Sequence, residues 1–236
     1  METRRPSGTS ASVKSRDTVV VGLDLAGSPH RTTGFCVLDH RLEARTLAVH
    51  SDSEIIRRTV EAEPVLVSID APLSLPRGRR TIDDRNGPHF RQCDLELRRR
   101  GIRFFPVTLG PMRMLTSRGI RLRQEFERRG LPVAESYPGA AQDILGIARK
   151  AHGVEALRRA LARQGLRGLA PRRGLGHDEL DAVTSALVGV LWLLGRGEFI
   201  GDPTEGLMLL PLRGAMEQLR SGGGRGAPTT RSKRGR

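Results

Sequence analysis

Cysteine and long apolar runs are both scarce in this chain. Only Cys36 and Cys93 are present, and their spacing matches neither a metal site nor a thioredoxin-type pair. No apolar run near the N-terminus resembles a signal peptide, and the most apolar stretch is broken at Gly195 and Arg196, too early to span a bilayer. We therefore expect a cytoplasmic protein in a reducing compartment, with no membrane partner.

Aromatic residues are also few, with six Phe, one Trp and one Tyr among 236 residues. Proteins that bind single-stranded nucleic acid commonly stack bases on aromatic side chains. So small a number of aromatic residues argues against a platform of this kind, and the sequence predicts none.

Negative charge is in deficit, because 40 Lys and Arg face 26 Asp and Glu, a formal net charge of +14. Residues 220–236 hold six basic and no acidic residues, and residues 1–17 hold four basic and two acidic ones. Both ends lack apolar periodicity, so we expect disordered segments flanking one domain over residues 18–219. The +6 that remains suits a nucleic acid partner, DNA or RNA, although Arg-rich helices can equally present an ordinary solvated face. Nothing in the sequence predicts the oligomeric state.

The order of apolar segments predicts an α/β layered domain. Residues 18–25 and 64–70 are β-branched runs typical of buried strands, and residues 33–38 and 43–50 fit a hairpin. A fifth short strand is expected at residues 131–136. A helical insertion is expected at about residues 77–130. Helices are predicted over residues 52–62 with Ser51 as N-cap, and over residues 91–100, 110–129, 140–150, 154–164 and from 177 onward.

Four aspartates have placements that suggest a metal site. Asp24 and Asp70 each end a predicted buried strand, where open α/β sheets present their ligands. Asp178 and Asp181 are three residues apart at the start of an apolar helix, so they project from one face. Such a cluster repels itself unless cations bind, and hard oxygen ligands select Mg²⁺ or Mn²⁺. Each aspartate could instead cap a helix or a turn.

Other polar residues are candidates for supporting roles. Glu135 ends the fifth strand, and His177 precedes the acidic pair, where it could orient a ligand, carry a proton or simply cap the helix. A basic loop follows the fourth strand, and its arginines are candidate phosphate contacts: Arg79, Arg80 and Arg85.

Five short motifs carry a family resemblance: GLDLAGS (22–28), IDAPL (69–73), RQCD (91–94), ESYP (135–138) and HDELDA (177–182). In this order they resemble a predicted nuclease family, domain of unknown function 429 (DUF429). The resemblance implies a ribonuclease H-like fold, with a mixed five-stranded sheet in the order 3-2-1-4-5. The acidic helix is also similar to the closing helix of Holliday-junction resolvases. Those enzymes usually have Glu where this chain has Asp70, and only the DUF429 resemblance implicates Glu135.

These observations favour a metal-dependent nuclease. Asp24 would bridge two Mg²⁺ ions, and Asp70, Asp178 and Asp181 would complete their coordination in phosphodiester hydrolysis. One alternative is a catalytically silent nucleic-acid-binding protein that uses the Arg-rich helices and the basic tail. Another is a phosphotransferase of the sugar-kinase and actin class, whose first phosphate loop resembles residues 22–28. The length of the chain disfavours this reading, since those enzymes contain two copies of the fold.

Overall fold

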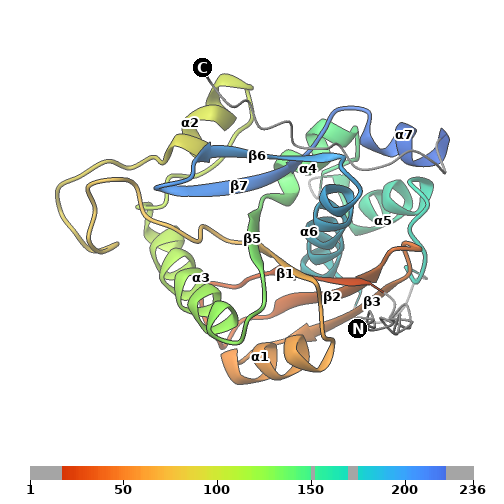
Figure 1. Cartoon of the computed structure of the whole chain (residues 1–236), viewed down its shortest axis with the longest axis horizontal. Helices are drawn as coiled ribbons and strands as arrows, with labels where there is room; N and C mark the ends of the chain where they lie inside the picture. The colour runs from red at the N-terminus through yellow and green to blue at the C-terminus, as the bar shows by residue number, and fades with distance from the viewer. Residues whose placement is uncertain (1–17, 150–151, 170–174, 222–236) are drawn as a thin grey trace, which may run out of the picture.

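The computed structural model describes residues 18–149, 152–169 and 175–221, which build a seven-stranded mixed sheet with helices on both faces (Figure 1). The strand order is β3-β2-β1-β4-β5-β7-β6. The first three strands pair antiparallel, the steps from β1 to β4, β5 and β7 are parallel, and β6 pairs antiparallel with β7. The strands are β1 (Val19–Asp24), β2 (Thr33–Asp39), β3 (Ala44–Val49), β4 (Leu66–Asp70), β5 (Val133–Ser136), β6 (Gly197–Asp202) and β7 (Gly206–Pro211).

The first five strands follow the expected order 3-2-1-4-5, which confirms the ribonuclease H-like arrangement. The expected number of five strands is wrong, because the β6–β7 hairpin extends the sheet beyond β5. Two glycines and half-exposed residues make β6 a weak strand signal in the sequence. Its partner β7 joins the sheet through β5, and this long-range pairing cannot be read from local sequence.

Helix α6 (His177–Leu193) covers one face of the sheet and lies directly on β1 and β2. Three glycines permit this approach. A Cβ on Gly22 would lie 2.1 Å from the carbonyl oxygen of Ala182, and one on Gly34 would lie 1.9 Å from that of Asp178. Gly189 lies on α6 itself, and a Cβ there would lie 2.7 Å from Cγ1 of Val20 in β1. The start of α6 is therefore held against the carboxyl end of β1. Helices α4 (Pro138–Leu145) and α5 (Val154–Arg163) pack beside α6 in the same apolar core.

The opposite face is covered by α1 (Asp52–Glu61) and α3 (Gly110–Arg128), whose buried residues join a second core. Helix α2 (Gln92–Arg99) lies against β6 and β7, and the short α7 (Ala215–Ser221) follows the hairpin. Arg118 of α3 is 1% exposed and donates to Asp52 Oδ1 (2.7 Å) and to the carbonyls of Ala26 and His50. This arginine therefore ties the second face to the loop after β1.

All six predicted helices are present, and five of them end within one residue of the prediction. The helix predicted over residues 140–150 instead ends at Leu145, because Gly146 caps it in the left-handed conformation. Ser51 caps α1 as predicted, accepting from the Glu54 N–H at 3.2 Å. The predicted disordered end at residues 1–17 lies outside the described residues, as does the predicted tail beyond Ser221, to which α7 extends. Among the residues that the structure describes, no helix has both the length and the hydropathy needed to cross a bilayer.

Candidate active site

Two carboxylates lie side by side at the carboxyl edge of the sheet. Asp24 is the last residue of β1 and Asp70 the last of β4, and the two are direct partners in the parallel register. Side chains alternate along a strand, and Gly22 faces α6, so Asp24 and its neighbour Asp70 also face α6. Strands in a sheet are about 4.8 Å apart. Carboxylates on neighbouring strands repel each other, and a cation bound beside them lowers that repulsion.

Ser136 extends this row to a third strand. It is the last residue of β5 and pairs in register with Asp70, so Asp24, Asp70 and Ser136 follow one another across β1, β4 and β5. Its side chain is 1% exposed, and its Oγ has no hydrogen-bond partner among the described residues. A buried hydroxyl without a partner is costly, and it is a common sign of a ligand or ion that completes the site.

Helix α6 contributes Asp181 from above the sheet. The residue is 4% exposed, and its Oδ1 accepts a hydrogen bond from Gln142 Nε2 at 2.7 Å. The same amide nitrogen lies 3.3 Å from Thr184 Oγ1, one turn further along α6. Gln142 of α4 therefore fixes the orientation of the Asp181 carboxylate.

These side chains line one cavity of about 400 Å³. Asp24, Asp70, Asp181, Ser136 and Gln142 all contribute to it. Its remaining walls come from β5, β7, α2, α3, α4 and the segments that adjoin β4 and these helices: Ala71, Pro72, Arg91, Asp94, Leu97, Phe104, Phe105, Met112, Leu115, Glu135, Tyr137, Gly139, Arg149 and Met208. The cavity thus joins the carboxyl ends of three parallel strands to the start of α6.

Asp178 and His177 do not line this cavity. The Asp178 carbonyl lies against Gly34 of β2, and its side chain is half-buried one turn before Asp181. The Nδ1 atom of His177 is shielded from solvent and has no hydrogen-bond partner in the described part of the chain. Glu179 provides the N-terminal cap of α6 instead, since its Oε2 accepts from the Gly176 N–H at 2.9 Å. Neither Asp178 nor Asp181 therefore caps α6.

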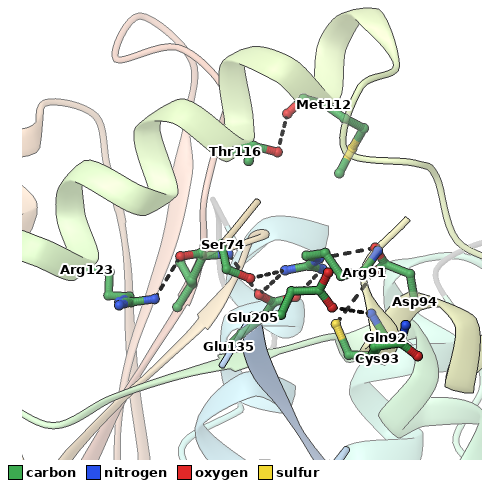
Figure 2. A network of polar contacts seen from close by, with 11 residues as sticks. Ser74, Arg91, Gln92, Cys93, Asp94, Met112, Thr116, Arg123, Glu135 and Glu205 are labelled. Carbon is green, nitrogen blue, oxygen red and sulfur yellow. Dashed lines mark hydrogen bonds and ion pairs between the residues drawn. The ribbon is translucent and has the colours of Figure 1, made fainter. Parts of the chain in front are cut away.

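Glu135 belongs to a buried ion-pair network centred on Arg91 (Figure 2). Arg91 is 1% exposed and donates from Nη1 and Nη2 to both oxygens of Glu135, at 2.6 and 2.7 Å. It also bonds Asp94, with Nη2 to Oδ1 at 2.9 Å, and Glu135 Oε2 accepts the Leu73 N–H at 2.8 Å. Burial raises the pKa of Glu135, while Arg91 and the Leu73 amide oppose that rise. Alternation places Glu135 on the face of β5 opposite Ser136, so it does not join the aspartate row.

The three arginines of the basic loop do not line the cavity either. Arg79 is buried and donates to the carbonyls of Pro88, Asp84 and Gly87 at 2.6, 2.7 and 3.1 Å. It shapes residues 79–88 from within. Arg80 and Arg85 are exposed on the same loop.

Residues 22–205 match the family described as protein of unknown function (DUF429). This match spans most of the chain. The chain belongs to this family. No protein of curated function matches the chain in sequence.

Two solved structures are similar to this DUF429 protein at low identity. Both are RuvC of Thermus thermophilus, one described as in complex with Holliday junction substrate. Each is 18% identical over 75% of this chain, with 96% and 97% of the RuvC chain covered and TM-scores of 0.40 and 0.39. A TM-score of this size carries no activity over to the DUF429 protein.

The donor set suits a hard cation, but it is not a closed cage. Asp24, Asp70, Asp181 and the Ser136 hydroxyl are all oxygen donors, as Mg²⁺ and Mn²⁺ prefer. Within residues 18–149, 152–169 and 175–221, no three His, Cys, Asp or Glu side chains are grouped closely enough to hold one ion. The site therefore fits a cation carried by the Asp24 and Asp70 pair, with water or substrate supplying further ligands.

Sequence reasoning missed four residues of this site: Ser136, Gln142, Tyr137 and Arg149. Ser136 and Tyr137 lie in the ESYP motif, which supported the family resemblance without indicating a role for them. Gln142 and Arg149 lie in or just after α4, and nothing local in the sequence marks them as facing the cavity. Arg149 is held by Asp143, with Nε to Oδ1 at 2.7 Å.

Proposed function

We propose that this DUF429 protein hydrolyses phosphodiester bonds in nucleic acid at the cavity that contains Asp24 and Asp70. The observation that supports this most strongly is the in-register pair of carboxylates at the ends of β1 and β4, with Asp181 and the unpartnered Ser136 hydroxyl lining the same cavity.

Asp24 and Asp70 would hold Mg²⁺ or Mn²⁺, and water or substrate would supply the further ligands. Asp181 would lie beside the ion in the same cavity, kept in place by Gln142. A bound ion supplies Lewis-acid activation of water and of the phosphoryl oxygen. Ser136 would donate its free hydroxyl hydrogen bond to a phosphate oxygen or a water in the cavity, and Arg149 would attract the phosphate. Asp178 remains a ligand predicted from the sequence alone, and the phosphate roles of Arg79, Arg80 and Arg85 likewise stay predictions.

The direct test is cleavage of a nucleic acid panel by the wild type and by Asp24→Asn. Branched, double-stranded and single-stranded DNA and RNA would be incubated with Mg²⁺, Mn²⁺ or a chelator. We expect cleavage that requires both the metal and Asp24. Asp83→Asn makes the same change at an exposed carboxylate and should leave cleavage intact.

Stability separates a ligand from a structural role for Asp24. If Asp24 holds a cation, Asp24→Asn removes carboxylate repulsion, so the Tm without metal should stay equal or rise. The increase in Tm that Mg²⁺ or Mn²⁺ produces in the wild type should shrink in the variant. A lower Tm without metal, together with no metal-induced increase in the wild type, would contradict the proposal.

The main alternative is a nucleic-acid-binding protein without catalysis. The net charge of +14 and the lack of a closed metal cage among the described residues favour it. Binding without cleavage under every metal condition would support this alternative. The phosphotransferase reading is disfavoured, because the described residues form one sheet rather than two copies of the fold.

A further inference from the structure

A second hollow opens directly beside the carboxylate cavity. Its volume is about 740 Å³, and it shares Phe104, Phe105, Tyr137 and Arg149 with that cavity. We call it the aromatic groove. It is formed mainly by the end of α2 and the segment that leads from α2 to α3. Anything bound at Asp24 and Asp70 that extends past Tyr137 therefore enters this groove.

The groove gathers half of the scarce aromatic residues. Phe90, Phe104, Phe105 and Tyr137 line it, out of eight aromatic residues in the whole chain. Phe104 is held edge-on against Phe90, with ring centroids 5.9 Å apart and an interplanar angle of 85°. Tyr137 is also fixed, because its hydroxyl donates to the Arg103 carbonyl at 2.7 Å.

Phe105 differs from its neighbours in being 67% exposed, more than any other large apolar side chain among the described residues. A phenyl ring exposed to water beside a polar cavity contributes little to the packing of the core. Exposed apolar surface at the rim of a site is a usual mark of binding.

The charges of the groove are positive. Arg98, Arg103 and Arg149 line it, and no Asp or Glu does so in the described part of the chain. The Arg98 guanidinium lies 4.2 Å from the centroid of the Phe90 ring. Arg149 pairs with Asp143, whereas neither Arg98 nor Arg103 is within ion-pair distance of a carboxylate among the described residues. Aromatic faces interleaved with arginines are the surface that an unpaired nucleotide needs, because the base stacks and the phosphate is attracted.

We propose that the aromatic groove holds an unpaired nucleobase stacked on Phe105, next to the phosphate at the carboxylate site. This inference rests on the proposed function and names its substrate class: single-stranded nucleic acid, or a duplex with an unpaired base beside the scissile phosphate. Arg103, which has no carboxylate partner among the described residues, holds a phosphate that flanks the stacked base.

Binding measured in a chelator tests this without any turnover. Fluorescence anisotropy would compare a labelled single strand with the same backbone carrying abasic sugars, in DNA and in RNA. The wild type should prefer the strand with bases by about tenfold, the loss typical of removing one stacking partner. Phe105→Ala should bind both strands equally, and Phe105→Trp should restore the preference. Phe199→Ala changes an exposed Phe on β6, away from the groove, and should behave as the wild type.

Two results would overturn the inference. One is a wild type that binds both strands with equal affinity. The other is a Phe105→Ala loss that is the same with and without bases, because Phe105 would then contact the backbone or stabilise the fold. Far-UV circular dichroism of each variant identifies a folding defect, and in that case Phe105→Leu provides the test of stacking.

The same measurements separate this inference from the nuclease proposal. If the base preference depends on Phe105 and no substrate is ever cleaved, the stacking inference is supported and the nuclease proposal is contradicted. If cleavage depends on Asp24 while the base preference is absent, the nuclease proposal is supported and the stacking inference is contradicted.

Discussion

At the scale of single residues, Arg91 is a charged side chain that is buried between two carboxylates, so its substitution should affect stability strongly. It pairs with both Glu135 and Asp94, each of which is also almost fully buried. Removing one partner of a buried ion pair leaves an uncompensated charge, which costs about 3–5 kcal/mol. We expect Arg91→Met to lower the free energy of unfolding by about this amount in urea titration.

The matched control is Arg57→Met, which removes an exposed arginine that pairs with Glu61 on the surface of α1. Exposed pairs contribute little, so its loss should be far smaller. Equal losses of unfolding free energy in the two variants would show that burial does not increase the contribution of the Arg91 ion pairs to stability.

The two cysteines provide a second prediction at this scale. Cys36 and Cys93 are both 0% exposed, and burial raises the pKa of each thiol. The thiolate is the reactive form, so a raised pKa suppresses alkylation. We expect native protein at pH 8 to resist iodoacetamide, while both cysteines react in denaturant, as mass spectrometry would show. Rapid labelling of native protein would mean that the sheet core or α2 opens readily.

At the scale of elements, the site depends on how closely α6 approaches β1. Gly22→Ala would place a Cβ 2.1 Å from the Ala182 carbonyl oxygen and 2.5 Å from the Ala186 nitrogen, both in the backbone of α6. The helix must move, and overpacking of this kind costs about 1–3 kcal/mol. Thermal unfolding should show the loss, and activity should fall further because Asp181 moves away from Asp24.

Gly110→Ala is the control for that substitution. Gly110 begins α3, and no atom lies within 4 Å of the position of an added Cβ. Alanine is favoured over glycine in a helix, so no loss of stability is expected. A similar loss at both glycines would contradict the role assigned to the contact between α6 and β1.

At the scale of the whole molecule, net charge should govern association with nucleic acid. Truncation after Ser221 removes five basic and no acidic residues, so the formal charge falls from +14 to +9. Nucleic acid binding should weaken, and the plot of log K against log salt should become shallower, because fewer counterions are released. A full-length variant with Gln at these five positions should match the truncation. An unchanged salt slope would exclude the tail as a binding arm.

Local patterns in the sequence were sufficient for most of the fold. Buried strands ending in Asp24 and Asp70, the Ser51 cap and the helices follow from periodicity and capping, which are properties of neighbouring residues. The β6–β7 hairpin was missed because its place in the sheet depends on the pairing of β7 with β5, which joins Glu135 to Met208, 73 residues later in the chain. Composition also does not reveal that half of the aromatic residues gather in one groove, because that depends on the tertiary structure.

By itself, the sequence determined which residues end the central strands and which carboxylates begin α6, because side-chain alternation and helical spacing are local. Only the tertiary structure decided which of those carboxylates share a cavity. Asp181 turns toward Gln142 and lines it with Asp24 and Asp70, whereas Asp178 does not. Glu135 also lines the cavity, but it lies on the other face of its strand, where Arg91, 44 residues away, binds it. Such pairings arise from packing between distant elements, and no local pattern encodes them.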